Sequence, residues 1–203
     1  FTDVIGVDSS GKIHASKVLS ESTSYDDSVI TGIRQILQLS SEDKIPLEKI
    51  ERVRIGTTIA TNALLEHKGS KTALLITSGF KDLLEIGNQA RPSLFDLSIV
   101  KPAQLYHSVI EVEERLGADG NIIRKLDERK LELDLINIYN SGIQSVAIVL
   151  MHSWKNPVNE ERCYNIAKKV GFSNISISSR IMPLIKIVGR GQTTVVDSYL
   201  YPI

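Results

Sequence analysis

The chain has 203 residues, of which 42% are apolar and 24% are charged, a composition typical of a folded globular protein. Its length fits one large domain or two small ones. The 24 Lys and Arg residues equal the Asp and Glu residues in number, so no net charge attracts nucleic acid or an anionic membrane surface. No apolar run approaches the roughly 20 residues that cross a bilayer. We therefore expect neither nucleic acid nor a membrane as a partner.

The cysteine content and the first residues indicate the compartment. Cys163 is the single cysteine, which rules out a disulfide within the chain and fits a reducing compartment. It shares one face of a predicted helix with Ile166, Ala167 and Val170, so we expect a buried thiol without a catalytic role. The sequence opens at Phe1 with no initiator methionine and no signal-like segment. We expect a cytoplasmic protein of which this sequence is a fragment, or of which the true start is missing.

The first part of the chain is predicted to form a small sheet covered by a helix. Ser9 to Gly11 read as the turn of an opening hairpin, and Ser24 is a candidate helix cap. The predicted strands cover Val4–Val7, Ile13–Leu19 and Arg52–Ile55, and the predicted helix covers residues 26–39.

Two short aliphatic runs mark a second core. Thr72–Ile76 and Val146–Leu150 have the continuous apolar character of parallel strands covered on both faces. Helices are predicted from Asp127 to the stop at Gly142 and from Asn156, followed by Pro157, to Gly171. This alternation predicts a layered α/β fold with mostly parallel sheets. We expect residues 1–70 with 180–203 to form one subdomain and residues 71–179 to form a second α/β lobe.

Two polar clusters are candidate sites. Residues 56–62, which include Gly56, Thr57, Thr58 and Asn62, follow a predicted strand and precede the helical stretch Ala63–Glu66, so their N–H and hydroxyl groups suit a phosphate or carboxylate. Ordinary helix capping by Thr57 or Thr58 explains the same pattern. Gln89 and Arg91 lie in a polar turn whose amide and guanidinium groups suit a small polar substrate, although a solvated loop has the same composition.

The four histidines have no close metal-ligand spacing. His152 alone follows the end of a buried strand, where α/β proteins commonly bind ligands. The alternative for His152 is a structural role in the turn at Asn156.

Several motifs in chain order resemble the hydantoinase A / 5-oxoprolinase family. The strongest is Gly-Thr-Thr-Ile-Ala-Thr-Asn-Ala-Leu-Leu-Glu over residues 56–66 with Lys68-Gly69. Residues 79–84, 86–92 and 94–97 extend the match, as do Glu-Arg-Leu at 114–116, His-Ser-Trp at 152–154 and Thr193-Thr194. Ile55, Asn159 and Gly189 depart from the family pattern, where histidine or an acidic residue is frequent.

The resemblance implies part of an actin/hexokinase/Hsp70-like ATPase fold with a second α/β lobe, and an ATP- and Mg²⁺-dependent hydrolase of 5-oxoproline or hydantoins that acts through a phosphorylated amide. Phe1-Thr2-Asp3 resembles the end of the family's N-terminal phosphate loop. The resemblance therefore implies that Thr2, Asp3 and Gly56 contact nucleotide, with Asp3 also on the metal. Thr57 and Thr58 are implied to serve catalysis. Asn62, Gln89, Arg91 and His152 are implied to contact a small cyclic-amide substrate.

The family's remaining parts lie in the C-terminal half of its A chain, and prokaryotic relatives usually need a separate hydantoinase B-type subunit. We therefore expect this fragment to bind ATP weakly and to turn nothing over. Two alternatives stay open. Acetone and acetophenone carboxylases are built on similar chains and would phosphorylate an enolate, and the fragment could be a subunit-assembly module without catalysis.

Overall fold

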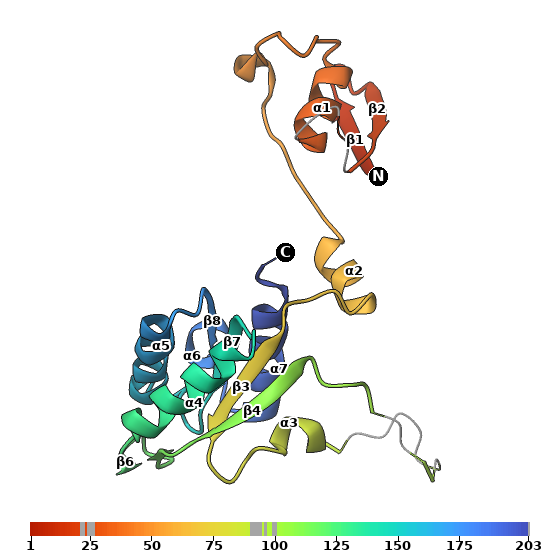
Figure 1. Ribbon diagram of the computed structural model, residues 1–203. Helices are drawn as coiled ribbons and strands as arrows, with labels where there is room; N and C mark the ends of the chain where they lie inside the picture. The colour runs from red at the N-terminus through yellow and green to blue at the C-terminus, as the bar shows by residue number, and fades with distance from the viewer. Residues whose placement is uncertain (21–22, 24–26, 90–94, 96, 99–100, 203) are drawn as a thin grey trace. The chain divides into compact units, whose positions relative to one another are not determined.

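The computed structural model describes residues 1–20, 23, 27–89, 95, 97–98 and 101–202 and divides the chain into two compact units, Phe1–Gly56 and Thr57–Ile203 (Figure 1). Each unit has its own sheet. Among the described residues, no helix combines the length and the apolar character that a bilayer-crossing segment requires.

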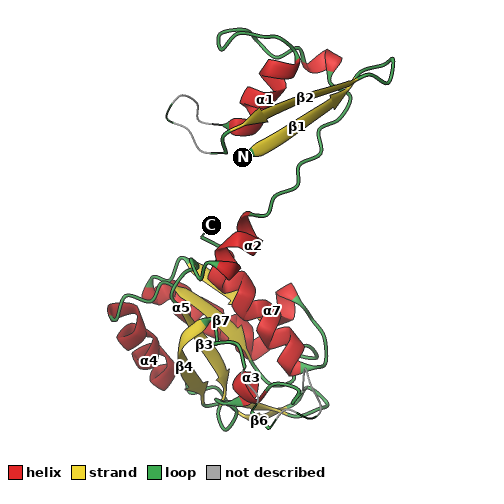
Figure 2. Cartoon of the chain, turned by 90° about the vertical axis from the view of Figure 1, so that its right-hand side faces the viewer, coloured by secondary structure: helices red, strands yellow, loops and turns green. Residues whose placement is uncertain are grey.

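The first unit is an antiparallel hairpin with a helix on one face. β1 (Thr2–Val7) pairs with β2 (Ile13–Val18), and α1 (Ser28–Ile36) packs against both strands (Figure 2). The helix begins at Asp27, whose carboxylate accepts the N–H groups of Val29 and Ile30 at 2.7 and 3.0 Å. The predicted hairpin and helix are confirmed, and the predicted cap at Ser24 lies outside the described residues.

α1 approaches the hairpin at a glycine. Gly32 is the buried residue of α1, and a Cβ placed there would lie 2.3 Å from Val4 Cγ2. The absence of a side chain at residue 32 therefore sets how closely this helix and sheet pack. A single 3₁₀ turn, η1 (Leu47–Lys49), follows.

The predicted strand at Arg52–Ile55 is wrong. Residues 51–58 have no regular structure, and Val53 and Ile55 are 50% and 70% exposed. A strand needs a neighbour to satisfy its N–H and C=O groups, and β1 and β2 pair only with each other among the described residues. This segment is an exposed connection between the two units.

The second unit is built on four parallel strands. β3 (Thr72–Thr77), β4 (Tyr106–Val112), β7 (Ser145–Val149) and β8 (Asn174–Ile177) form the order β4-β3-β7-β8. The central pair is in register from Thr72 opposite Ser145 to Ile76 opposite Val149. Every residue of β3 and β7 is buried, as their continuous aliphatic sequences predict. The predicted parallel sheet is confirmed.

Helices cover both faces of this sheet. α4 (Glu128–Asn140) and α5 (Val158–Val170) pack on one face, where Cys163, Leu135 and Ala167 meet Leu75 and Ile148. α7 (Ile187–Leu200) and the short α3 (Leu83–Ile86) cover the other face (Figure 2).

The predicted ends of α4 and α5 are confirmed within a residue or two. Asp127 caps α4 by accepting the Lys130 N–H at 3.0 Å, and Gly171 ends α5 in the left-handed region. Asn156 Oδ1 accepts the Val158 N–H at 3.1 Å, and Pro157 is the last residue before α5. The buried thiol of Cys163 is also confirmed.

Shorter elements complete the second unit: α2 (Ile59–Leu65), the two-stranded β5 (Arg115–Leu116) and β6 (Ile122–Arg124), and α6 (Ser178–Ile181). α2 contacts α7, and α7 also packs on β7 and β3. The predicted grouping of residues 1–70 with 180–203 into a partial ATPase-like subdomain stays a prediction.

Candidate functional site

Thr2 and Asp3 lie at the start of the hairpin in the first unit. The Thr2 hydroxyl lies 3.0 Å from the Ser20 hydroxyl and 3.1 Å from the Ser28 hydroxyl. The Asp3 carboxylate is 63% exposed and forms an ion pair of 3.2 Å with Lys17. Both side chains therefore offer hard oxygen atoms near the surface of this unit, next to a compensating positive charge.

Gly56, Thr57 and Thr58 form the exposed segment that leads into α2. Thr57 Oγ1 accepts the N–H of Ile59, the first residue of α2, at 3.2 Å from one position outside the cap. Thr58 is the residue before the helix and makes no side-chain cap bond. Asn62 lies within α2 and is exposed. Thr58 and Asn62 thus keep polar side chains at the surface, where they are accessible to a ligand.

Gln89 follows α3 and has a left-handed backbone, with φ of 54°. A positive φ is uncommon for a residue with a side chain. Arg91 lies outside the described residues, so its proposed partnership with Gln89 stays a prediction.

His152 is the third residue after β7 and also has a left-handed backbone, with φ of 59°. Its carbonyl accepts the N–H groups of Lys155 at 2.9 Å and Asn156 at 3.3 Å, so the main chain of His152 closes this turn. The pKa of Asp119 is lowered, first by the N–H and side chain of Asn121 and to a smaller extent by the charge of His152. His152 therefore lies at the carboxyl end of a central strand, within electrostatic reach of an acidic turn.

A buried polar network beneath His152 was not predicted as a site from the sequence. Glu114, Asn159, Glu160 and Arg190 are each 0% or 1% exposed, and all four bond at the carboxyl ends of the strands. Burial raises the pKa of Glu114 and lowers that of Arg190. A clue was present for one of these residues, because Glu114 lies in a family motif. Periodicity alone does not distinguish such buried charges from surface charges.

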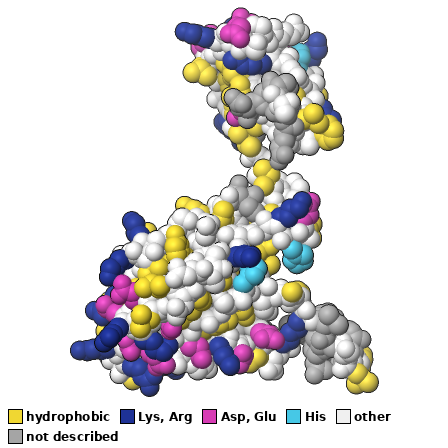
Figure 3. Space-filling view, in the orientation of Figure 1, with side chains coloured by type: hydrophobic (Ala, Val, Ile, Leu, Met, Phe, Trp, Pro, Cys, Tyr) yellow, Lys and Arg dark blue, Asp and Glu magenta, His cyan; other side chains and the backbone are white. Residues whose placement is uncertain are grey.

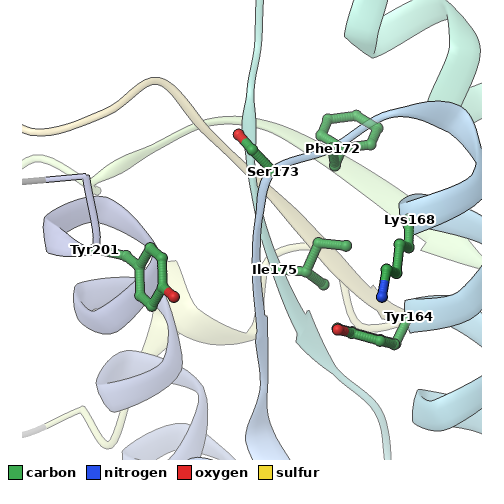
Figure 4. A pocket seen from close by; sticks show the side chains of 6 residues that line it. All are labelled: Tyr164, Lys168, Phe172, Ser173, Ile175 and Tyr201. Atoms are coloured by element: carbon green, nitrogen blue, oxygen red, sulfur yellow. The ribbon is translucent and has the colours of Figure 1, made fainter.

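Two surface hollows contain none of the predicted site residues. A hollow of about 150 Å³ lies between α5, β8 and the end of α7, where Tyr164 and Tyr201 stand on opposite sides of Ile175 (Figure 4). A second, of about 410 Å³, lies between β4 and α4 and includes the Lys130–Asp134 ion pair. Neither His152 nor any residue of the segment 56–58 lines either hollow.

The surface charge agrees with the balanced composition. On the face drawn in Figure 3, basic and acidic side chains are interspersed over the second unit. Within the part of the chain that the structure describes, no group of three or more His, Cys, Asp or Glu residues could hold a metal ion. The role of Asp3 as a magnesium ligand stays a prediction.

Comparison with known proteins decides the family. The sequence model described as "Hydantoinase/oxoprolinase N-terminal region" matches residues 1–171. The chain belongs to this family. The hydantoinase/oxoprolinase match includes every predicted site residue, from Thr2 to His152, and it ends at the C-terminus of α5.

A curated relative and a solved structure each align with the whole chain. 5-Oxoprolinase 1 of Arabidopsis thaliana is 41% identical over 230 residues, which cover 100% of this chain and 18% of that protein. The crystal structure of the ATP-dependent caprolactamase from Pseudomonas jessenii aligns with a TM-score of 0.76 at 28% identity, over 100% of this chain and 30% of that chain. The chain therefore spans less than a third of either protein.

A nucleotide-free acetone carboxylase structure aligns with a TM-score of 0.63 at 22% identity, over 70% of this chain and 22% of that one. At this identity the likeness is one of fold. The same architecture thus occurs in an enzyme of ATP-dependent acetone carboxylation.

Proposed function

We propose that this chain is the N-terminal part of an ATP-dependent cyclic-amide hydrolase that opens the ring of 5-oxoproline or a hydantoin. The observation that carries the proposal is the match of the entire chain to a 5-oxoprolinase at 41% identity, together with an ATP-dependent caprolactamase that shares its fold. Both relatives act on cyclic amides according to their names. The complete activity belongs to a longer polypeptide, because the chain spans 18% of the first of these proteins.

The chemistry explains why such an enzyme would use ATP. An unstrained amide is a poor electrophile, and its nitrogen is a poor leaving group. Transfer of the γ-phosphoryl group to the amide oxygen breaks the bond between Pγ and the bridging oxygen of ATP and releases ADP. Water then adds to the activated carbon, and the ring C–N bond breaks as nitrogen gains a proton, which leaves an acyl phosphate. A second water hydrolyses the acyl phosphate to the carboxylate and inorganic phosphate. Such catalysis depends mainly on positioning and on neutralising phosphate charge.

The placement of the candidate residues supports a division of roles. Thr2 and Asp3 carry oxygen ligands at the surface of the first unit, which suits the magnesium-bound nucleotide. When bound there, magnesium would neutralise phosphate charge. Gly56, Thr57 and Thr58 precede a helix of only seven residues, so their contribution to phosphate binding rests on hydroxyl and N–H donors rather than on a helix dipole.

The substrate side of the proposed site uses amide, guanidinium and imidazole groups. Asn62 and Gln89 have exposed side chains, and Arg91 would supply a bidentate partner for the carboxylate of 5-oxoproline. His152 would hydrogen-bond to the ring amide or its product. The rest of the polypeptide and a hydantoinase B-type subunit are the partners that we propose for turnover.

The test is ATP consumption by the full-length protein, with and without its partner subunit, on 5-oxoproline, hydantoin and acetophenone with bicarbonate. ADP formation that depends on 5-oxoproline and yields glutamate, or on hydantoin with ring opening, supports the proposal. ADP formation only with the ketone and bicarbonate refutes it. Thr57→Ala and Arg91→Ala in the full-length enzyme then separate catalysis from assembly. If these residues serve only assembly, the variants should bind the partner subunit less well while the complex that still forms turns over substrate at the wild-type rate.

The second candidate is a subunit of an ATP-dependent ketone carboxylase. The acetone carboxylase likeness favours it as a fold, whereas the higher identity and complete coverage of the caprolactamase favour the hydrolase. The ketone arm of the assay decides between the two.

A further inference from the structure

The topology of the second sheet singles out one place for a ligand. β3 and β7 are parallel neighbours at its centre. The chain leaves β3 towards α3, whose Leu84 packs with Leu74 on the face covered by α7. It leaves β7 towards α5, whose Cys163 packs with Ile148 on the opposite face. Where two neighbouring parallel strands send their connections to opposite faces, α/β proteins bind ligands outside the carboxyl ends of the strands.

His152 stands at this switch point in an uncommon backbone conformation. Its φ of 59° lies in the left-handed region, which disfavours residues that carry a Cβ. Such strain persists only where the surroundings fix it, and it concentrates at functional sites. A glycine would adopt the same backbone without strain. His67 has the same backbone conformation, so it is the place of His152 at the switch point, together with its φ, that singles it out.

The residue before His152 is held by the Thr77 hydroxyl, which in turn bonds to the buried carboxylate of Glu114. The Met151 N–H donates to Thr77 Oγ1 at 2.8 Å, so the Thr77 hydroxyl must use its proton elsewhere, and it donates to Glu114 Oε1 at 2.5 Å. Asn159 Nδ2 donates to Glu114 Oε2 at 2.6 Å. Glu114 is 1% exposed and takes part in none of the ion pairs found among the described residues.

A second buried carboxylate, that of Glu160, holds Leu150. The Leu150 N–H donates to Glu160 Oε1 at 2.9 Å, and the Leu150 carbonyl accepts Ser153 Oγ at 2.9 Å and Arg190 Nη2 at 2.7 Å. The chain on both sides of His152 is thus fixed from the interior. Two buried carboxylates and a buried guanidinium are costly to desolvate, and an apolar contact could hold the same loop at lower cost.

We propose that Thr77 and Glu114 are positioning residues that hold the loop of His152 at the β3–β7 switch point, so that its imidazole contacts the amide substrate. This inference rests on the proposed function for the identity of the substrate. It adds to that function the two buried residues through which the position of His152 is set.

The experiment uses the full-length enzyme and compares His152→Gly with His67→Gly. His67 is another histidine with a left-handed backbone, at φ of 53°, so the second variant makes the same chemical change and relieves the same strain at a matched position. Both variants should unfold at a temperature no lower than the wild type. Only His152→Gly should lower kcat/KM, and by at least about tenfold, because loss of one hydrogen bond to the transition state has an effect of that size. Equal activity of the two variants would overturn the proposal.

A double-mutant cycle tests the positioning role. Thr77→Val removes both hydrogen bonds of the hydroxyl at nearly constant volume, and Thr77→Ser keeps them. Thr77→Val should lower kcat/KM while His152 is present and should have little further effect in the His152→Gly background, since coupled residues are not additive. Thr77→Ser should keep the wild-type kcat/KM within a few fold. An equal loss from Thr77→Val in both backgrounds would show a general structural role and refute the inference.

The assay separates this inference from the proposed function. If the wild type consumes ATP only with the ketone and bicarbonate, the hydrolase proposal and the amide contact fail together, while the same cycle on that reaction still tests whether Thr77 acts through His152. A readout without turnover is the hydrogen exchange of the Met151 amide, which Thr77→Val should accelerate and Thr77→Ser should not. Unchanged exchange in Thr77→Val would refute the link between Thr77 and the loop.

Discussion

Gly69 offers the most direct test of the packing in the second unit. It lies between α2 and β3, and a Cβ placed there would lie 1.9 Å from Cε1, 2.1 Å from Cδ1 and 2.2 Å from Cζ of Tyr199. The Tyr199 side chain is 4% exposed, and the carbonyl of the same residue accepts the Ser70 N–H at 2.8 Å. The ring is therefore fixed against the glycine and has no open space into which to move.

Gly69→Ala should destabilise this unit by about 1–3 kcal/mol, the usual cost of overpacking a close contact. For a chain of this size each kcal/mol lowers the midpoint of thermal unfolding by roughly 2–4 °C. We therefore expect a decrease of about 2–12 °C. Trp154 is the single tryptophan and lies in the same unit, so its fluorescence during heating reports on the relevant transition.

Gly189→Ala is the matched control. Gly189 lies in α7, and a Cβ there would meet nothing within 4 Å. This variant should gain about 0.5–1 kcal/mol, because alanine favours a helix over glycine. In a Tyr199→Leu background, Gly69→Ala should cost clearly less than in the wild type. If Gly69→Ala unfolds with the wild type, or costs the same in both backgrounds, the steric reasoning is wrong.

Three further predictions concern the buried polar groups. The Glu160 carboxylate accepts three hydrogen bonds, from the Leu150 N–H, the Ser178 hydroxyl and the Ser179 N–H. Glu160→Gln replaces one of the two acceptor oxygens by a donor, so we expect the free energy of unfolding in urea to fall by about 1–3 kcal/mol. An unchanged midpoint would contradict these hydrogen bonds. Because burial raises the pKa of Glu114, the folded state binds its proton more tightly than the unfolded state does. The stability contributed by this carboxyl is therefore full below its ordinary pKa of 4.5 and declines as the pH rises towards the folded pKa. The free energy of unfolding of the wild type should therefore fall relative to that of Glu114→Gln over that range. A wild type that gains stability relative to Glu114→Gln as the pH rises would contradict this prediction. Cys163 is buried and the pKa of its thiol is raised by burial, so a thiol-specific reagent should label the chain only as fast as it opens; rapid labelling of the native protein would show that the thiol is accessible.

Local sequence signals predicted the elements that local chemistry specifies. The all-aliphatic runs of β3 and β7, the aspartate that caps α4 and the glycine that ends α5 each act over a few residues, and all were placed within about two residues. The segment 52–55 was misplaced because strand formation depends on a partner elsewhere in the chain, and residues 51–58 have none among the described residues. A run of residues that favour β structure does not form a strand unless another strand offers its edge for pairing.

The site was predicted less completely than the fold. The sequence motifs named Thr57 and His152, and the structure shows one hydroxyl bonded to the first N–H of a helix and one histidine in a strained turn. The motif containing Glu114 gave no indication that its carboxylate is buried and reaches residues 77 and 159. Contacts between residues that are about 40 apart depend on the strand order, which no local pattern encodes.

The strand order also determines when each part of the protein can fold. In the hairpin, Val4 pairs with Ser16, so the first unit closes a short loop soon after it is synthesised. In the second unit the central partner of Leu75 is Ile148, about 70 residues later, and the entropy of closing that loop delays the pairing. The apolar β3 therefore leaves the ribosome before β7 has been synthesised, so the edge that pairs with β7 in the folded protein stays unpaired during that time. During that interval β3 is the segment most exposed to aggregation, and a chaperone would have the most reason to bind it.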